Sequence, residues 1–323
     1  MISVIIPVYN VEPYLFACRN SVLGQSVTNF EIICNYDTST DLSLDVLKYF
    51  AKKDSRVKIL QNETNMGPGY SRNRGLEIAE GKYISFRDDD DFLSQEAFEI
   101  LVKKVESDGL DVLTFKNIVL YENKNDFGMG SYYDMKFMDE FENKIFNHWD
   151  LDKTKLFEMS NALWNKFYLK SFLGDNNIRF PNENRIHEDN PFFYGVITSA
   201  ERISIINFYF HNRRRKEGSI MTLTNERLFD NIDIAKIVLD YFIKNLELYD
   251  YYKKDLLTYI FNSLFNAKYH KIDSNLKEEF YIRVQDACRI FIKQYGLYDD
   301  ITENVCLVIL EFFKFDDWRC EDD

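Results

Sequence analysis

The 323-residue sequence predicts an α/β fold with a mainly parallel central sheet, followed by a helical C-terminal region. Two observations support this prediction. In the first 115 residues, short apolar runs alternate with helix-like segments, and this β-α-β-α order is typical of a parallel sheet covered by helices. From about residue 225 onward, apolar residues recur at the 3.6-residue period of a helix.

Short apolar runs near the N-terminus are the candidate strands of the sheet. They are Ile2–Ile6, Phe30–Cys34, Val57–Leu60, Tyr83–Phe86 and Val112–Phe115. Helix-like segments lie between them near residues 12–24, 41–53, 70–80 and 95–108. Residues 116–160 lack clear periodicity and are expected to form a crossover. Residues 161–221 return to mixed structure, with a strand expected at Ile203–Phe210.

Two apolar stripes mark the C-terminal helices. The first holds Leu228, Ile232, Ala235, Leu239 and Phe242, and the second holds Leu256, Ile260 and Leu264. We therefore expect a catalytic domain over residues 1–224, with halves at 1–115 and 116–224, and a helical region over 225–323. Because such stripes usually belong to a core, we expect the helical region to serve packing, association between copies of the chain, or proximity to a membrane.

Composition and charge narrow the class of protein. Hydrophobic residues make up 46% of the chain, so a sizeable core can form, and a net charge of −13 disfavours nucleic acid as a partner. The cysteines show no CxxC pair and no zinc-site spacing; they are Cys18, Cys34, Cys288, Cys306 and Cys320. We expect free, mostly buried thiols in a reducing cytoplasm. No signal peptide and no apolar run of about 18 residues is apparent, which agrees with a cytoplasmic location.

Polar residues follow three of the predicted strands. Pro7-Val8-Tyr9-Asn10 follows the first strand, Asp37 follows the second, and the acidic run Asp88–Asp91 follows the fourth. Because ligands of parallel sheets bind at the carboxyl ends of the strands, these three clusters predict one binding site at the same edge of the sheet.

The acidic run Asp88–Asp91 has two readings. Carboxylate oxygens suit Mg²⁺ or Mn²⁺, which proteins bind through one or two carboxylates together with substrate phosphates. Alternatively, the run is a solvated acidic turn in which Asp91 or Ser94 caps the next helix. The four carboxylates alone do not separate these readings.

The surrounding motifs favour the first reading. Four blocks appear in order, namely Ile2–Asn10, Glu31–Asp41, Asn65–Gly75 and Gly81–Asp91. Together they closely resemble the family 2 glycosyltransferases of bacterial surface-polysaccharide synthesis. The resemblance resumes at Trp164–Lys166, Ile178–Pro181, His187–Phe193 and Arg213–Met221, whereas the chain past about residue 225 has no matching motif.

The resemblance implies a GT-A fold and a donor site for a nucleotide-activated sugar, with UDP as the expected nucleotide. Pro7, Val8 and Tyr9 would line the nucleoside pocket, and Asp37 would accept a hydrogen bond from the base unless it serves an Asx-turn or cap. Arg72 would approach the base or the diphosphate, or else be a surface helix charge. Asp88 would hold the ribose with Asp89 beside it. Asp90 would ligate the Mn²⁺ or Mg²⁺ that bridges the diphosphate.

The resemblance also implies an inverting transfer with a separate general base. Asp189 matches the family's base, and Glu188 would support it or bind the acceptor; the alternative is an acidic pair at a helix N-terminus.

The basic run 213–216 is a further candidate for binding the donor. Arg213 and Arg215 would contact the diphosphate from a mobile loop, because the planar guanidinium suits phosphate. A solvated loop or an anchor to anionic lipid headgroups is the alternative. His211 is either a further metal ligand or structural.

Some positions depart from the family pattern. Thr38 stands where the family usually has Gly, and Tyr36 where Asp or Asn is common, which makes the base pocket bulkier. Arg87 replaces a usual apolar residue and is expected to screen the carboxylates.

The expected function is transfer of a sugar to a glycan or lipid-linked glycan acceptor in capsule, lipooligosaccharide or other surface-polysaccharide synthesis. Peripheral association with the inner face of the cytoplasmic membrane and homo-oligomer formation through the C-terminal helices are left open. The alternatives are a nucleotide-dependent transferase of a non-sugar group and a sugar-nucleotide-binding protein without turnover. A dinucleotide-binding GxGxxG or a P-loop GxxxxGK[ST] is absent from the sequence.

Overall fold

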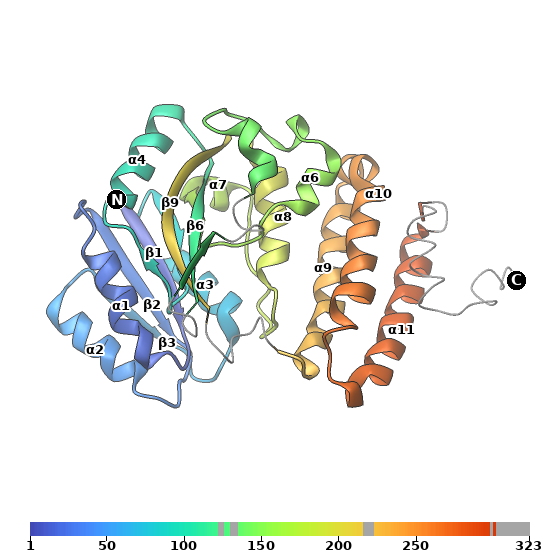
Figure 1. Cartoon of the computed structure of the whole chain (residues 1–323), viewed down its shortest axis with the longest axis horizontal. Coiled ribbons are helices and arrows are strands. Elements are labelled where there is room, and N and C mark those ends of the chain that lie inside the picture. Colours follow the sequence, from blue (N-terminus) through green and yellow to red (C-terminus); the bar gives the residue numbers. More distant parts are fainter. Residues whose placement is uncertain (122–125, 130–134, 216–222, 298–299, 302–323) are drawn as a thin grey trace, which may run out of the picture. The chain divides into compact units, whose positions relative to one another are not determined.

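The fold was analysed in a computed structural model, which describes residues 1–121, 126–129, 135–215, 223–297 and 300–301. The chain divides into two compact units. One comprises residues 1–152 and 159–217, and the other comprises residues 153–158 and 218–323. The first unit holds the sheet and the second holds helices (Figure 1).

The sheet of the first unit has nine strands. In chain order they are β1 (Ile2–Val8), β2 (Phe30–Tyr36), β3 (Val57–Gln61), β4 (Tyr83–Phe86), β5 (Phe92–Leu93), β6 (Val112–Tyr121), β7 (Asp126–Met129), β8 (Lys166–Leu169) and β9 (Ile203–Arg215). Their order in the sheet is β3-β2-β1-β4-β8-β6-β9-β5, with β7 paired to β6. The strands β1, β2, β3, β4, β6 and β9 run in one direction, and β5, β7 and β8 run in the other. The expected mainly parallel sheet is therefore confirmed.

Helices cover both faces of this sheet. They are α1 (Glu12–Leu23), α2 (Ser43–Lys53), α3 (Gly67–Ile78), α4 (Ala97–Asp108), α7 (Lys170–Asp175) and α8 (Asp189–Ser199). The apolar sides of α1, α2 and α4 share one core cluster with the strands, in which Phe30 and Phe98 meet edge to face. On the opposite face, α3 packs against β1, and Phe192 of α8 packs against Phe86 of β4.

Glycine permits the close approach of α3 to β1. A Cβ atom at Gly75 would lie 2.5 Å from Ile5 Cγ2, so only glycine fits this contact without a shift. This packing holds α3 close to the carboxyl edge of the sheet, where its residue Arg72 belongs to the candidate site.

The second unit is built from helices. They are α6 (Lys153–Glu158), α9 (Asp230–Lys244), α10 (Leu246–Asn262), the π-helical turn Ser263–Lys268 and α11 (Lys277–Tyr295), with short 3₁₀ turns between them. The predicted stripes are buried except at Ile232, which is half-buried, and Leu239, Phe242, Leu256 and Ile260 are all in the core. Within the part of the chain that is described, no helix is long and apolar enough to cross a membrane.

Two expectations about local structure were wrong. Residues 116–121, expected in an irregular crossover, continue strand β6, which pairs with β9. Arg213, Arg214 and Arg215 do not form a loop, because they are the last residues of β9 and pair with residues 119–121 of β6. Residues 216–221 of the same basic block lie outside the described residues. The thiols of Cys18, Cys34 and Cys288 are free and buried, as expected, and Cys306 and Cys320 lie outside the described ranges.

Candidate active site

The acidic run forms the turn between β4 and β5. Asp88, Asp89 and Asp90 are half-buried, and Asp91 is buried. The backbone N–H of Tyr9, at the end of β1, donates to Asp89 Oδ2 over 3.3 Å. The backbone N–H of Asp37, after β2, donates to the carbonyl of Val8. The three polar clusters therefore meet at one edge of the sheet, as the strand order requires.

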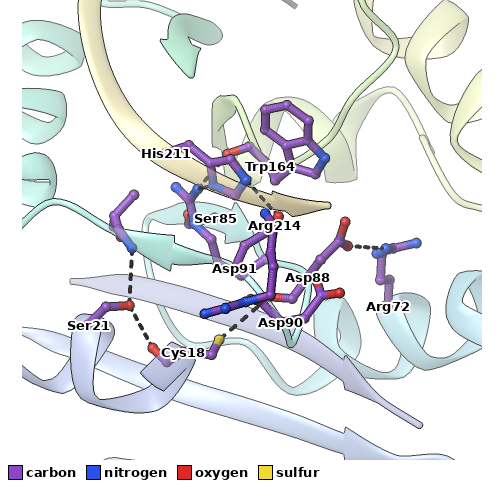
Figure 2. Close-up of polar contacts among 12 residues, drawn as sticks. Cys18, Ser21, Arg72, Ser85, Asp88, Asp90, Asp91, Trp164, His211 and Arg214 are labelled. Carbon is purple, nitrogen blue, oxygen red and sulfur yellow. Dashed lines mark hydrogen bonds and ion pairs between the residues drawn. The ribbon is translucent and has the colours of Figure 1, made fainter. Parts of the chain in front are cut away.

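Asp91 fastens this turn to β9. Its Oδ2 lies 2.8 Å from His211 Nε2, and its Oδ1 accepts from the backbone N–H of Arg214 over 2.7 Å (Figure 2). Burial and the adjacent Asp90 raise the pKa of Asp91, whereas the N–H of Arg214 and the charges of Arg213 and Arg87 oppose the rise and favour the carboxylate. Asp91 therefore does not cap the following helix.

Neither Asp91 nor Ser94 caps helix α4 with its side chain, contrary to the solvated-turn reading. The side-chain oxygen of Gln25 accepts from the N–H of Phe98 over 3.0 Å, at the start of α4. The hydroxyl of Ser94 donates instead to the carbonyl of Tyr209.

His211 and Arg87 form a buried polar chain beneath the turn. Arg87 Nη1 lies 2.9 Å from His211 Nδ1, and the imidazole stacks on Trp164 with ring centroids 4.2 Å apart. Arg87 also donates to the Ser85 hydroxyl and to the carbonyl of Trp164. Arg87 therefore turns towards His211 and Trp164, and among the described residues it donates to no carboxylate of the acidic turn, although its charge opposes the rise in the pKa of Asp91. The structural reading of His211 is favoured, because both ring nitrogens are engaged.

Asp37 is enclosed by donors. Its Oδ1 accepts from Asn62 Nδ2 over 2.7 Å and from the N–H of Met66 over 2.9 Å, and its Oδ2 accepts from the N–H of Gly67 over 2.8 Å. The carboxylate therefore organises the start of α3 rather than an Asx-turn before α2. The expected contact of Asp37 with a base stays a prediction. Thr38 has φ +56°, which explains why a glycine would suit this position.

The predicted nucleoside-pocket residues differ in exposure. Tyr9 is 46% exposed and Pro7 is half-buried, so both side chains can meet a ligand. The side chain of Val8 lies in the core cluster and is fully buried. Only the backbone of Val8 can therefore contribute to a pocket at this edge.

Arg72 joins the acidic turn to a distant part of the chain. Its Nη2 donates to Asp88 Oδ1 over 3.0 Å, and its Nη1 donates to Glu188 Oε1 over 2.5 Å. Arg72 is 6% exposed, so the reading as a surface charge is wrong. Burial raises the pKa of Asp88 and of Glu188, and the adjacent Arg72 opposes the rise in both. Arg72 thus holds the carboxylate of Glu188, and the supporting role expected for Glu188 stays a prediction.

Asp189 is the first residue of α8, so the acidic pair does begin a helix. Burial and the neighbouring Glu188 raise the pKa of Asp189 to about 7, although Arg72 opposes the rise. Its Oδ1 is buried and has no hydrogen-bond partner among the described residues. A carboxylate with an unused oxygen and a pKa near neutrality can exchange a proton with a ligand.

The chain offers carboxylates for a metal but no complete shell. Among the described residues, no group of three His, Cys, Asp or Glu side chains could hold a metal ion. The half-buried Asp90 and its neighbours supply oxygen ligands, whereas His211 and Asp91 are engaged with each other. This donor set fits Mg²⁺ or Mn²⁺ completed by phosphate oxygens of a ligand.

Asn73 is a positioning residue that the motif reading did not single out. Its side chain donates to the carbonyl of Phe180 over 2.9 Å and accepts from the N–H of Phe180 over 3.0 Å. It therefore holds the segment that leads to Glu188 against α3. Asn73 directly follows Arg72 in a block that matches the family, and this position could have identified it from the sequence.

The basic residues at the end of β9 are not tested as ligands of a diphosphate. The Arg213 guanidinium lies over the Trp164 ring, 5.8 Å from its centroid, and its contact with a diphosphate stays a prediction, as does that of Arg215.

Comparison with known proteins places these features in a family. A sequence profile described as Glycosyl transferase family 2 matches residues 3–173. The chain is 26% identical to "Uncharacterized glycosyltransferase EpsJ" of Bacillus subtilis over 71% of this chain and 65% of that protein. It is 32% identical to a poly(ribitol-phosphate) beta-glucosyltransferase of Bacillus spizizenii, over 69% of this chain and 33% of that protein. The chain thus matches about two thirds of one relative and a third of the other.

A solved structure shares the fold. The crystal structure of S. aureus TarS 1-349 in complex with UDP-GlcNAc superposes with a TM-score of 0.71 at 23% identity, covering 95% of this chain and 83% of that chain. The expected GT-A-type fold is therefore confirmed.

Proposed function

Because the chain belongs to glycosyl transferase family 2, we propose that it transfers a sugar from a UDP-activated donor to a surface-polymer acceptor with inversion at the anomeric carbon. One observation carries the proposal. Arg72 contacts both Asp88 of the acidic turn and Glu188, which is next to Asp189, across 116 residues of sequence. This contact supports the proposal, because it brings the proposed donor-site residue Asp88 close to the neighbour of the proposed base.

The donor is proposed to bind at the carboxyl edge of β1, β2 and β4. The exposed ring of Tyr9 would meet the nucleoside, and Asp88 and Asp89 would contact the ribose. Asp90 would hold Mn²⁺ or Mg²⁺ together with the diphosphate. A metal bound there supplies a Lewis acid that neutralises charge on the leaving diphosphate. The relative solved with UDP-GlcNAc supports a UDP-linked donor.

Asp189 is proposed to act on the acceptor. Its unpartnered Oδ1 takes the proton of the acceptor hydroxyl, and the hydroxyl oxygen then forms the new bond to the anomeric carbon. The bond from that carbon to the diphosphate breaks, and the electron pair leaves with the nucleoside diphosphate. The pKa of about 7 suits this role, because a base is most effective when its pKa lies near the working pH.

The acceptor is proposed to be a glycan or lipid-linked glycan of a bacterial surface polymer. The similarity to a relative named poly(ribitol-phosphate) beta-glucosyltransferase supports this class.

Release of nucleoside diphosphate from a panel of UDP-, GDP- and CMP-sugars, with and without Mn²⁺, tests the proposal. We expect release from a UDP-sugar only when the divalent ion is present. Calorimetry with UDP in Mn²⁺ or EDTA should show that affinity depends on the metal, and that Asp90→Asn abolishes this dependence while circular dichroism is unchanged. Equal UDP affinity in both buffers would remove Asp90 from the metal role.

A further inference from the structure

We infer that Arg87 is a positioning residue: it fixes His211 as the neutral imidazole that donates from Nε2 to Asp91, and so holds the acidic turn in the shape that presents Asp90. The inference deepens the proposed function, because it assigns a role at the same site to a residue that the function has not used.

The direction of each hydrogen bond follows from the chemistry of the groups. A guanidinium can only donate, so His211 Nδ1, 2.9 Å from Arg87 Nη1, must accept. The ring proton is therefore on Nε2, which donates to Asp91 Oδ2 over 2.8 Å. Arg87 and Asp91 are each 3% exposed and His211 is fully buried, so water does not compete for these bonds.

The position of the His211 ring is fixed, as well as its tautomer. It lies nearly parallel to the Trp164 ring, with an interplanar angle of 11°. Arg87 is itself held by the hydroxyl of Ser85 and by the carbonyl of Trp164. The guanidinium thus connects β4, the segment at Trp164 and β9 around one ring.

The consequence reaches Asp90 through the backbone. Arg214, three residues after His211 on β9, donates its N–H to Asp91 and its side-chain Nε to the carbonyl of Asp90 over 3.1 Å. Together with the His211 bond, these contacts tie both residues to β9. Without the Arg87 donor, Nδ1 can take the proton, and Nε2 then becomes an acceptor facing the carboxylate of Asp91. The turn would lose one of its anchors.

The test compares Arg87→Met, Arg87→Lys and a control away from the site, Arg56→Met, whose half-buried arginine pairs with Asp54 and lies over the ring of Phe30. Ring ¹⁵N NMR reports the tautomer of His211, and His211→Gln assigns its signal among the four histidines of the chain. Calorimetry with UDP in Mg²⁺ or EDTA measures the metal-dependent part of the affinity.

We expect the wild type to show the Nε2–H tautomer and Arg87→Met to lose it. The metal-dependent UDP affinity of Arg87→Met should fall roughly 10- to 100-fold, as for other residues that orient metal ligands. Affinity in EDTA should not change. Arg87→Lys, which keeps one donor, should restore part of both properties, and Arg56→Met should match the wild type.

Three results would overturn the inference. They are an Nδ1–H tautomer in the wild type, an Arg87→Met protein with unaltered metal dependence, and a Mg²⁺-induced shift of His211 ¹⁵N typical of direct ligation. The wild-type tautomer is measured without any change at Arg87, so misfolding of Arg87→Met leaves the inference open to refutation. If the wild type binds no UDP in either buffer, the proposed function fails, and the tautomers of the wild type and Arg87→Lys still decide this inference.

Discussion

At the scale of single residues, the raised pKa of Asp189 sets the pH dependence of transfer. A base must be ionised, so we expect the transfer rate to fall about tenfold per unit as the pH drops below about 7 and to level off above it. Asp189→Asn keeps the size of the side chain but cannot take the proton. It should lower kcat roughly 10²- to 10⁴-fold and leave the Kd for UDP unchanged. Parallel loss of UDP binding would contradict the assignment, and Glu188→Gln should be milder.

The same pKa has a consequence for stability. The folded value lies above the unfolded value of about 3.9, so burial disfavours the charged form. Asp189 therefore contributes most to stability below pH 4, and that contribution is lost as the pH rises through about 7. We expect Asp189→Asn to raise Tm at pH 8 relative to the wild type, with little difference at pH 4. A lower Tm at pH 8 would show that the carboxylate is not desolvated.

Asp37 offers a test that needs no ligand. Asn at this position keeps one acceptor oxygen, but its NH₂ group would face at least one of the N–H groups that now donate to the carboxylate. We expect Asp37→Asn to lower the free energy of unfolding by about 2 kcal/mol or more, measured by urea denaturation without nucleotide. The exposed Asp45 of α2 is a matched control, whose change to Asn should cost less than about 1 kcal/mol. Equal effects would mean that Asp37 is not a structural anchor.

At the scale of elements, Gly→Ala changes in two helices distinguish the effect of helix propensity on stability from the effect of packing. Gly75→Ala should improve helix propensity, yet its Cβ would meet Ile5 of β1 at 2.5 Å. We expect a net loss of about 1–3 kcal/mol in unfolding free energy, because overpacking outweighs propensity. At Gly174 of α7 a Cβ meets nothing within 4 Å, so Gly174→Ala should be neutral or stabilising. A stable Gly75→Ala protein would contradict the tight contact of α3 with β1.

The elements that sequence predicted well are those whose pattern is local. Strand β4 was found at its observed bounds because a short run, apolar except for Ser85, precedes an abrupt change to charge. Helix α8 was not identified, because its Phe192–Ile197 stretch is buried all round and lacks the one-sided stripe of a surface helix. The arginines that end β9 resemble a loop in composition, but their strand is defined by backbone pairing with β6.

In the site too, features with a local sequence pattern could be predicted, and features that depend on tertiary contacts could not. A run of carboxylates after a strand reveals the acidic turn without any tertiary information. The contact of Arg72 with Glu188 depends on how α3 and the start of α8 fold together, so neither residue discloses its partner in sequence. The polar chain of Arg87, His211 and Asp91 was equally hidden, because Arg87 and Asp91 lie between β4 and β5, whereas His211 lies on β9, 120 residues after Asp91.

At the scale of the whole molecule, the two units are interleaved in sequence. Helix α6 belongs to the helical unit, where Leu156 is fully buried and Phe157 packs against the rings of Phe242 and Tyr252. Removal of residues 225–323 leaves these side chains without their partners. We expect the truncated chain to aggregate, and Leu156→Ser with Phe157→Ser to restore solubility. Size-exclusion chromatography with light scattering measures both outcomes, and a soluble, monomeric truncation without the added serines would contradict the division.

The bonds made by Asp37 also affect the electric field at the sheet edge. The first N–H groups of a helix and its dipole commonly make a site for a phosphate. In α3 those of Met66 and Gly67 already face a carboxylate, so the positive end of this helix is neutralised by the chain itself. The net charge of −13 adds no long-range attraction for an anion. A diphosphate must therefore bring much of its counter-charge with it, and we expect the nucleotide to bind as a complex with its divalent ion.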